Sequence, residues 1–257
     1  MKIVPRSALA ILFCLGVAPQ ALSQSAGQHS TDYTVTLAGF TIAKASFNAI
    51  LRDKDYTVLG RFRSAGIADL ISEISGETSA DGAIAGGKLV PDDYRLVYRK
   101  GKRSKVYEVK LKNGNIINTS ITPPPRRDPV TWVAMRDSDF KRVLDPLTGL
   151  MIPGDAKLCS GAIPVFDGET RMDIVLSDKG KQSFGIGRKR VDVTTCSARY
   201  VPRAGYKRGR KDIEFLKGAK MEVWFAKSDA VNVYAPVYIR VPTSVGDLKI
   251  SATRFGR

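Results

Sequence analysis

Hydrophobic and polar residues alternate along most of the chain, which is the pattern of half-buried β-strands. Eight short segments show this alternation, and Gly, Pro, Asn or Asp residues separate them. They cover residues 33–37, 94–98, 107–111, 172–176, 191–193, 221–225, 237–241 and 248–252. The dipeptides Asn113-Gly114, Asp167-Gly168 and Gly246-Asp247 are suited to tight turns. The sequence therefore predicts a mainly all-β fold, as a rolled antiparallel sheet, an open or spiral β-barrel, or a sandwich.

Two segments depart from this alternation and predict one or two short helices. Apolar residues in 67–74 fall at i, i+3, i+4 and i+7, which predicts an amphipathic helix that stops at Gly76. A weaker repeat in 140–147 suggests a second helix, which Pro146 must end or kink. The proline-rich segment 123–127 is expected to be a stiff, extended connector. Because similar strand patterns occur on both sides of it, residues 32–257 are expected to form one β-rich domain.

The N-terminus has the organisation of a cleavable secretory signal peptide. Lys2 and Arg6 precede an apolar run over residues 8–18, and Ala21-Leu22-Ser23 supplies small residues for a signal peptidase. Eleven apolar residues span about 16 Å as a helix, which is too short to cross a bilayer. We therefore expect residues 1–23 to be removed, leaving a periplasmic protein without a transmembrane segment. Residues 24–31 are polar and small, and are expected to be a disordered lead-in.

The chain is strongly basic, and its cations are grouped. The formal net charge is +16, and removal of Lys2 and Arg6 with residues 1–23 leaves +14. Such a charge favours acidic partners, here an anionic lipid or lipopolysaccharide surface, because export makes a nucleic acid improbable. The candidate residues for an anionic ligand are Arg99, Lys100, Lys102, Arg103, Lys105, Arg188, Lys189, Arg190, Lys207, Arg208, Arg210 and Lys211. If these groups converge they form a phosphate-binding patch, and if they diverge they are solvated loops.

Two cysteines remain after the signal peptide, Cys159 and Cys196. An even number in an oxidising compartment predicts a disulfide. Closing a loop of that length would stabilise the fold by roughly 3–4 kcal/mol in the chain-entropy model. A redox-active pair is not indicated, because the two cysteines do not have C-x-x-C spacing.

Few residue patterns for catalysis are present. The single histidine, His29, falls in the expected lead-in, which argues against triads and histidine-based zinc sites. The acid pairs Asp92/Asp93 and Asp167/Glu169 have the character of turn residues. We therefore predict no enzyme activity, no metal and no cofactor, with a carboxylate-dependent glycan hydrolase as a remote third hypothesis.

Three aromatic residues are candidates for an apolar cavity. Trp224 and Phe225 are adjacent, so on a strand their side chains face opposite sides of the sheet. Trp132 follows the proline-rich connector and is a candidate to cover a sheet edge. Each of the three is either a core residue or part of the wall of a lipid cavity.

Four stretches resemble a large group of exported bacterial proteins of unknown function. They are DYTVTLAGFTIAKASF (32–47), DPLTGL (145–150), VFDGETRMDI (165–174) and the C-terminal stretch over residues 221–255. The resemblance implies a two-cysteine periplasmic protein of Gram-negative bacteria that ends in a long antiparallel meander. In layout the group is similar to envelope-integrity proteins that form a spiral, barrel-like β structure with a disulfide.

Two functional hypotheses follow from the sequence. The first is a non-enzymatic periplasmic protein that supports envelope integrity by contacting an envelope protein or an anionic amphiphile. The alternative is a lipid or lipoprotein carrier with an apolar β-cavity. A cavity of several hundred Å³ would favour the carrier, and a filled core with a basic rim would favour the first hypothesis.

Overall fold

The computed structural model describes residues 26–71 and 73–256, and the predicted signal peptide lies outside these residues. The strands are β1 (Gly27–Leu37), β2 (Phe40–Leu51), β3 (Asp55–Ser64), β4 (Ile74–Ala85), β5 (Lys88–Lys100), β6 (Arg103–Lys112), β7 (Asn115–Thr122), β8 (Trp132–Val133), β9 (Ile152–Pro153), β10 (Ser160–Phe166), β11 (Arg171–Ile186), β12 (Lys189–Ala204), β13 (Tyr206–Lys207), β14 (Met221–Ser228), β15 (Val233–Thr243) and β16 (Gly246–Phe255). The helices are α1 (Ile67–Ile71) and α2 (Lys211–Gly218), and two 3-10 turns are η1 (Asp137–Phe140) and η2 (Thr148–Leu150). No helix among the described residues is long and apolar enough to cross a membrane.

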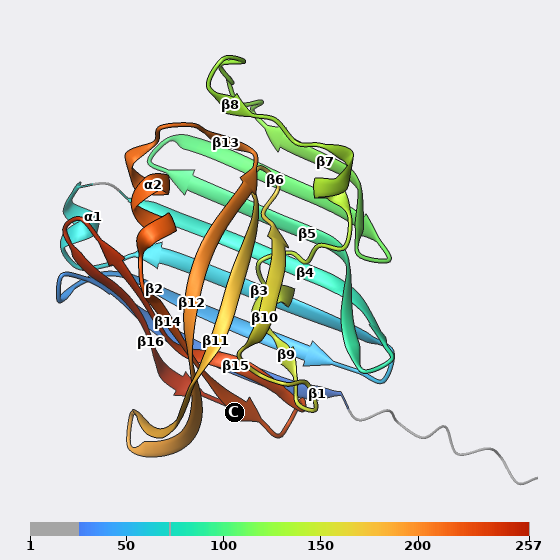
Figure 1. Cartoon of the computed structure of the whole chain (residues 1–257). Coiled ribbons are helices and arrows are strands. Elements are labelled where there is room, and N and C mark those ends of the chain that lie inside the picture. The colour runs from blue at the N-terminus through green and yellow to red at the C-terminus, as the bar shows by residue number, and fades with distance from the viewer. Residues whose placement is uncertain (1–25, 72, 257) are drawn as a thin grey trace, which may run out of the picture.

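One large antiparallel sheet organises the molecule, which confirms the predicted fold class. Its order is β10-β11-β12-β14-β15-β16-β1-β2-β3-β4-β5-β6-β7, and β9 adds to β15. Most strands that are neighbours in the sheet also follow each other along the chain. However, β16 pairs with β1, which brings the first and last strands side by side. The sheet rolls up, so that β10–β12 lie across β2–β6 in Figure 1. The small sheet of β8 and β13 stands beside it.

All eight segments predicted to be strands lie in strands, namely β1, β5, β6, β11, β12, β14, β15 and β16, whereas β2, β3, β4, β7 and β10 were not predicted. The same kind of alternation is present in β3, where Tyr56 and Val58 are buried and Leu59, Arg61 and Arg63 face solvent. At the turn between β6 and β7, Asn113 and Gly114 have φ of +52° and +72°, as the predicted tight turn requires.

The interior of the rolled sheet is filled by side chains from both layers. Tyr94 of β5, Val109 of β6 and Phe166 of β10 share one buried cluster. Ile186 of β11 joins Tyr33 of β1 in another. The two layers therefore share a continuous core.

A segment that contains no α-helix but includes the 3-10 turn η2, residues 143–151, runs through this interior, and we call it the plug. Leu144 forms a parallel bridge with Val165 of β10, and its N–H donates to Pro164 O at 2.8 Å. Asp145 Oδ1 accepts hydrogen bonds from the N–H groups of Leu147 and Thr148, at 2.8 and 3.0 Å. These bonds start η2 and explain the DPLTGL stretch as a structural motif.

The structure corrects both helix predictions. Residues 67–71 are helical, but β4 begins at Ile74 and continues through Gly76. Gly76 is needed in the strand because a Cβ there would lie 2.3 Å from Phe62 Cζ. In the 140–147 segment the second helix is replaced by η1 and the extended plug, because Leu144 pairs with β10. Helix α2 was missed, since only Ile213 of its residues is buried.

The expected disordered lead-in is wrong for residues 27–31, which form the first part of β1. His29 pairs with Ala49 of β2, and Thr31 pairs with Phe47 of β2 and Phe255 of β16. Pairing with β2, joined by β16 from Thr31 onward, orders these residues despite their polar sequence. The described residues before β1 comprise only Ala26.

Candidate functional site

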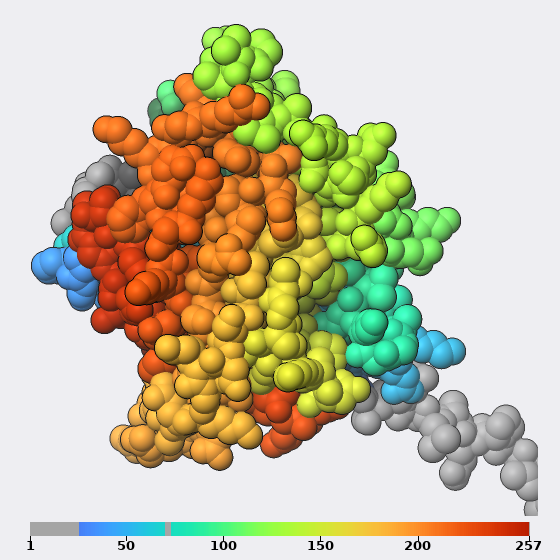
Figure 2. Space-filling model, viewed as in Figure 1, coloured from blue at the N-terminus to red at the C-terminus, as the bar shows by residue number. Residues whose placement is uncertain are grey.

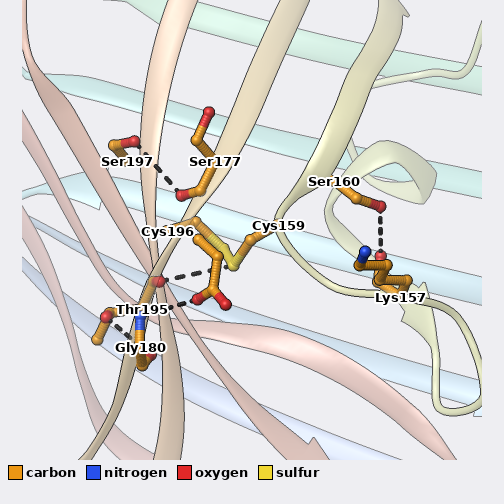
Figure 3. The surroundings of a disulfide bond; sticks show 9 residues. Lys157, Cys159, Ser160, Ser177, Gly180, Thr195, Cys196 and Ser197 are labelled. Atoms are coloured by element: carbon orange, nitrogen blue, oxygen red, sulfur yellow. Dashed lines mark hydrogen bonds between the residues drawn. A yellow bond between two sulfur atoms is a disulfide. The ribbon is translucent and has the colours of Figure 1, made fainter.

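Cys159 and Cys196 form the predicted disulfide. Cys159 precedes β10 and Cys196 lies in β12, and their Cα atoms are 5.4 Å apart. Both side chains are buried in the core, and Figure 3 shows the bond between the two chain segments. In the sheet, β11 lies between β10 and β12. The disulfide therefore links the start of the edge strand β10 to β12. This placement indicates a structural role.

Three cations lie in one row across the solvent-facing side of the sheet. Lys44 of β2 lies opposite Arg63 of β3. Arg63 lies opposite Ser75 of β4, and Ser75 lies opposite Arg99 of β5. Lys44, Arg63 and Arg99 are all exposed, and we call these three the cation row. Only Arg99 was among the residues proposed from the sequence to bind an anion.

The cation row carries positive charge that no acidic side chain compensates. Like charges placed directly opposite each other on neighbouring strands destabilise a sheet, as Lys44 and Arg63 do here. Among the described residues, no Asp or Glu forms an ion pair with any member of the row. The two acids nearby are engaged elsewhere: Asp32 Oδ2 is 2.7 Å from Arg254 Nε, and Glu77 Oε1 is 3.8 Å from Arg61 Nε. The row is therefore suited to an anionic ligand.

A surface groove of about 740 Å³ is lined by the cation row and Arg61. Its volume falls in the range of about 300–1,000 Å³ that is common for ligand sites. Ser75, Asp32 and Glu77 also line it. We call this hollow the cationic groove.

The three basic clusters seen in the sequence do not converge on one rim. Residues 188–190 occupy the tip of the β11–β12 hairpin, whereas residues 207–211 lie beyond its other end, around β13 and α2. Strands of 16 residues can separate those ends by about 50 Å. Figure 2 shows the hairpin tip at the lower end of the molecule and α2 near the upper left.

The first basic cluster, residues 99–105, is also divided. It spans the turn between β5 and β6, where successive side chains point to opposite faces of the sheet. Arg99 faces the cationic groove, whereas Lys105 Nζ lies 5.8 Å from the centre of the Tyr107 ring. The remaining cations of this turn, Lys100, Lys102 and Arg103, are exposed.

A separate apolar cavity lies inside the rolled sheet. It has a volume of about 150 Å³ and is lined by His29, Tyr33, Phe47 and Met151, among others. His29 is only 4% exposed, and its Nε2 lies 2.8 Å from Thr31 Oγ1. Burial lowers the pKa of His29, which favours the neutral ring. The only histidine of the chain is therefore part of the core, contrary to the expected position in a disordered segment.

The aromatic residues proposed for the cavity lie elsewhere. Phe225 is 1% exposed and belongs to the core cluster around the disulfide. Trp224 packs against Phe184 and Tyr238, with ring centres 5.4 and 4.4 Å away. Neither residue lines the internal cavity, because the cavity is formed by other strands and the plug. For both residues, core packing is therefore the better interpretation.

Trp132 lies on β8 at the surface. The Arg127 guanidinium carbon is 4.9 Å from the centre of its ring, a favourable cation–π distance. Trp132 also lines a hollow of about 520 Å³ with Arg203 and Arg208. Arg203 is held by Asp173, with Nη2 2.5 Å from Oδ2, and Arg136 and Asp139 also line this hollow.

The acid pair Asp167/Glu169 belongs to a turn. Asp167 Oδ1 accepts hydrogen bonds from the N–H groups of Glu169 and Thr170, at 2.9 and 2.7 Å. Its acceptor capacity therefore serves the connection between β10 and β11. Within residues 26–71 and 73–256 there is no cluster of three or more His, Cys, Asp or Glu residues suited to a metal.

Comparison with known families places the chain. A family model described as "Protein of unknown function (DUF3108)" matches residues 32–253. The chain belongs to the DUF3108 family. The resemblance seen in the sequence is thereby confirmed at the level of a family of unknown function, and the match spans both the cationic groove and the plug. No curated protein matches this DUF3108 chain significantly.

Two solved structures are similar to this DUF3108 protein. One is a beta-barrel-like protein of the domain of unknown function DUF1849 from Brucella abortus, with 11% identity, a TM-score of 0.49, and coverage of 89% of this chain and 97% of that chain. The other is a DUF1329 family protein from Desulfovibrio piger, with 10% identity, a TM-score of 0.22, and coverage of 91% and 86%.

Sequence reasoning missed Lys44, Arg61 and Arg63 because they are not clustered along the chain. The available signal was the alternation in residues 56–63, which places Arg61 and Arg63 on the side opposite Tyr56 and Val58. Bringing Lys44 to the same place requires the register between β2 and β3. That register is a property of the folded sheet.

Proposed function

We propose that this protein is an exported, non-enzymatic component of a Gram-negative cell envelope that binds an anionic envelope component through the outer face of its sheet. In this proposal the ligand is an anionic lipid or lipopolysaccharide, and binding supports envelope integrity. The N-terminal signal sequence supports a periplasmic location. Sequencing the N-terminus of the exported protein tests that location, with a start after Ser23 expected.

The uncompensated cation row is the observation that carries this proposal. Lys44 and Arg63 face each other at a cost to the fold, and a ligand with negative charge removes that repulsion. A non-enzymatic role is supported by the surroundings of His29, which packs against Phe255 with ring centres 4.4 Å apart and has Thr31 as its hydrogen-bond partner. A catalytic imidazole instead requires a positioned reacting group that substrate can reach.

Vesicle binding tests this function. We expect the mature chain to co-sediment with vesicles of phosphatidylcholine and phosphatidylglycerol, but not with phosphatidylcholine alone, and to be released by salt. Lys44→Gln with Arg63→Gln should weaken binding about thirtyfold, at about 1 kcal/mol for each cation. The matched control is Lys179→Gln with Lys181→Gln, which removes two exposed cations of β11. Equal losses in both variants would argue against the groove and for unspecific charge attraction.

The carrier is the second candidate, and the apolar cavity around His29 favours it. However, its volume of about 150 Å³ is below the roughly 300–1,000 Å³ of common ligand sites. An engineered apolar cavity of similar size in another protein holds only benzene or xenon. An acyl chain would therefore require the plug to move.

Native mass spectrometry separates the two candidates. We expect Lys44→Gln with Arg63→Gln, purified from the periplasm without detergent, to carry no lipid, because its outer site is weakened and the plug fills the interior. A stoichiometric lipid adduct that persists in this variant would favour the carrier. A partner protein retained in the spectrum would favour a scaffold that contacts an envelope protein.

A further inference from the structure

The cationic groove continues into a second hollow of different character. This neighbouring hollow has a volume of about 400 Å³ and shares Ser46, Arg61 and Glu77 with the cationic groove. Beyond that junction its lining is mostly neutral, with Asn48 and Ser79 on the solvent-facing side, and its one further cation, Arg95, has its Nε 3.3 Å from Glu108 Oε1. We call this hollow the neutral groove. The two hollows together form one bipartite surface on β2–β5.

The neutral groove offers groups suited to a hydroxylated ring. Asn48 Oδ1 accepts a hydrogen bond from Ser30 Oγ at 2.5 Å, which leaves the Asn48 amide donors facing outward. The Ser79 hydroxyl both donates and accepts. Leu59 lines the same hollow and is 51% exposed, so an apolar surface lies beside the polar groups. A sugar presents this combination of hydroxyls and C–H groups.

The junction between the two hollows contains a charged pair of both signs. Arg61 and Glu77 lie opposite each other on β3 and β4, with Nε and Oε1 3.8 Å apart. That distance is longer than a normal hydrogen bond, and both side chains are exposed. The pair can therefore offer a donor and an acceptor to neighbouring hydroxyls of one ligand.

We propose that this bipartite groove binds the phosphorylated sugar headgroup of an envelope glycolipid. The phosphate lies at Lys44, Arg63 and Arg99, and the sugar lies over Leu59 between Asn48 and Ser79. Phosphate suits the cationic groove because it carries up to two charges, and because each guanidinium can donate two parallel hydrogen bonds to its oxygens. This inference rests on the proposed function and adds the ligand class and its orientation.

Titration calorimetry of the mature chain tests the inference with three soluble probes. They are trehalose 6-phosphate, which joins a sugar to a phosphate, trehalose, and inorganic phosphate. We expect the phosphorylated disaccharide to bind at least about tenfold more tightly than either of the other probes, because it engages both grooves. Purified lipopolysaccharide should displace it.

Two variants assign the two halves of the site. Lys44→Gln with Arg63→Gln should weaken binding of both inorganic phosphate and trehalose 6-phosphate by about tenfold or more. Asn48→Ala should weaken only the sugar phosphate, by several-fold, and leave inorganic phosphate unchanged. The control remains Lys179→Gln with Lys181→Gln, which should change neither titration.

Each contrary outcome has a distinct meaning. If anionic vesicles bind but trehalose 6-phosphate binds no better than inorganic phosphate, the inference is overturned and the proposed function stands. If neither vesicles nor soluble probes bind, both are overturned. If Lys44→Gln with Arg63→Gln leaves the affinity for trehalose 6-phosphate unchanged, the sugar phosphate occupies another site. If lipopolysaccharide does not displace trehalose 6-phosphate, the probe does not mimic a glycolipid. Both results would overturn the inference.

Discussion

Loss of the disulfide, by Cys159→Ala with Cys196→Ala, is expected to lower the free energy of unfolding by about 2–5 kcal/mol. The bond closes a loop with a sequence separation of 37 residues, so its removal releases conformational entropy in the unfolded chain. It also frees β10, an edge strand whose only neighbour in the sheet is β11. Urea unfolding of the mature chain measures the loss. In a chain of this size the midpoint temperature should fall by about 5–15 °C.

Reduction of the native protein is the matched control for that variant, because it breaks the bond and keeps both sulfur atoms. We expect reduced protein and variant to show similar stability, and hydrogen exchange in β10 to accelerate in both. If the variant is less stable than the reduced protein, lost core packing accounts for the difference. Unchanged stability in both samples would contradict a structural role for the bond.

The sequence was sufficient to predict eight of the strands, because each of these has one buried and one solvated face, whereas β7, which has no buried residue, was missed. In β14, Met221, Val223 and Phe225 are buried and alternate with more exposed residues. The same reasoning located the cysteine pair, since Cys159 and Cys196 are the two cysteines beyond the predicted signal peptide. These features depend on local patterning or on simple counting, which a single sequence contains.

The arrangement of the sheet required the structure. The pairing of β1 with β16 joins residues more than 200 positions apart, as Val35 with Ile250, and no local pattern specifies it. Pairing with β2 is what orders His29 and overturns the expected lead-in for residues 27–31, and β16 adds a second partner from Thr31 onward. The polar sequence of residues 24–31 indicated disorder because it lacks apolar alternation, whereas β2 supplies a strand partner for residues 27–31.

The candidate site depends even more strongly on register. A shift of one residue between β2 and β3 would turn Lys44 to the opposite face from Arg63. Counting cations along the chain instead selected residues 188–190 and 207–211, which the β11–β12 hairpin separates. The cationic groove was therefore accessible to sequence reasoning only through Arg99.

The plug motif gives the second prediction of large effect, at Asp145. Its carboxylate is 1% exposed, and Oδ1 holds the N–H groups of Leu147 and Thr148. Asp145→Ala leaves both buried N–H groups unsatisfied and opens a small void, so we expect a loss of about 2–4 kcal/mol. Asp145→Asn keeps the Oδ1 acceptor and should cost much less. Urea unfolding at one pH compares the two variants, and equal costs would mean that these hydrogen bonds do not hold the plug.

The pH dependence of the unfolding free energy, compared between the native protein and Asp145→Asn, isolates the effect of the charge of Asp145. Burial raises the pKa of this carboxyl above its ordinary value of 3.8, and Oδ2 has no hydrogen-bond partner among the described residues. Below pH 3.8 the group is protonated in both the folded and the unfolded chain, so its contribution to stability is fully present. As the pH rises toward the raised pKa, the unfolded chain loses the proton first, and that contribution is lost.

Asp145→Asn cannot titrate, so its stability relative to the native protein should increase from about pH 4 toward neutrality. The native protein and Asp145→Asn share every other carboxylate, so their difference in unfolding free energy cancels the remaining pH dependence. Asp155→Asn, at an exposed position beyond the plug, serves as the control for replacing a carboxylate by an amide. A difference between native protein and Asp145→Asn that stays constant with pH would show that the buried carboxyl titrates normally. In that case the plug would hold Asp145 in contact with water.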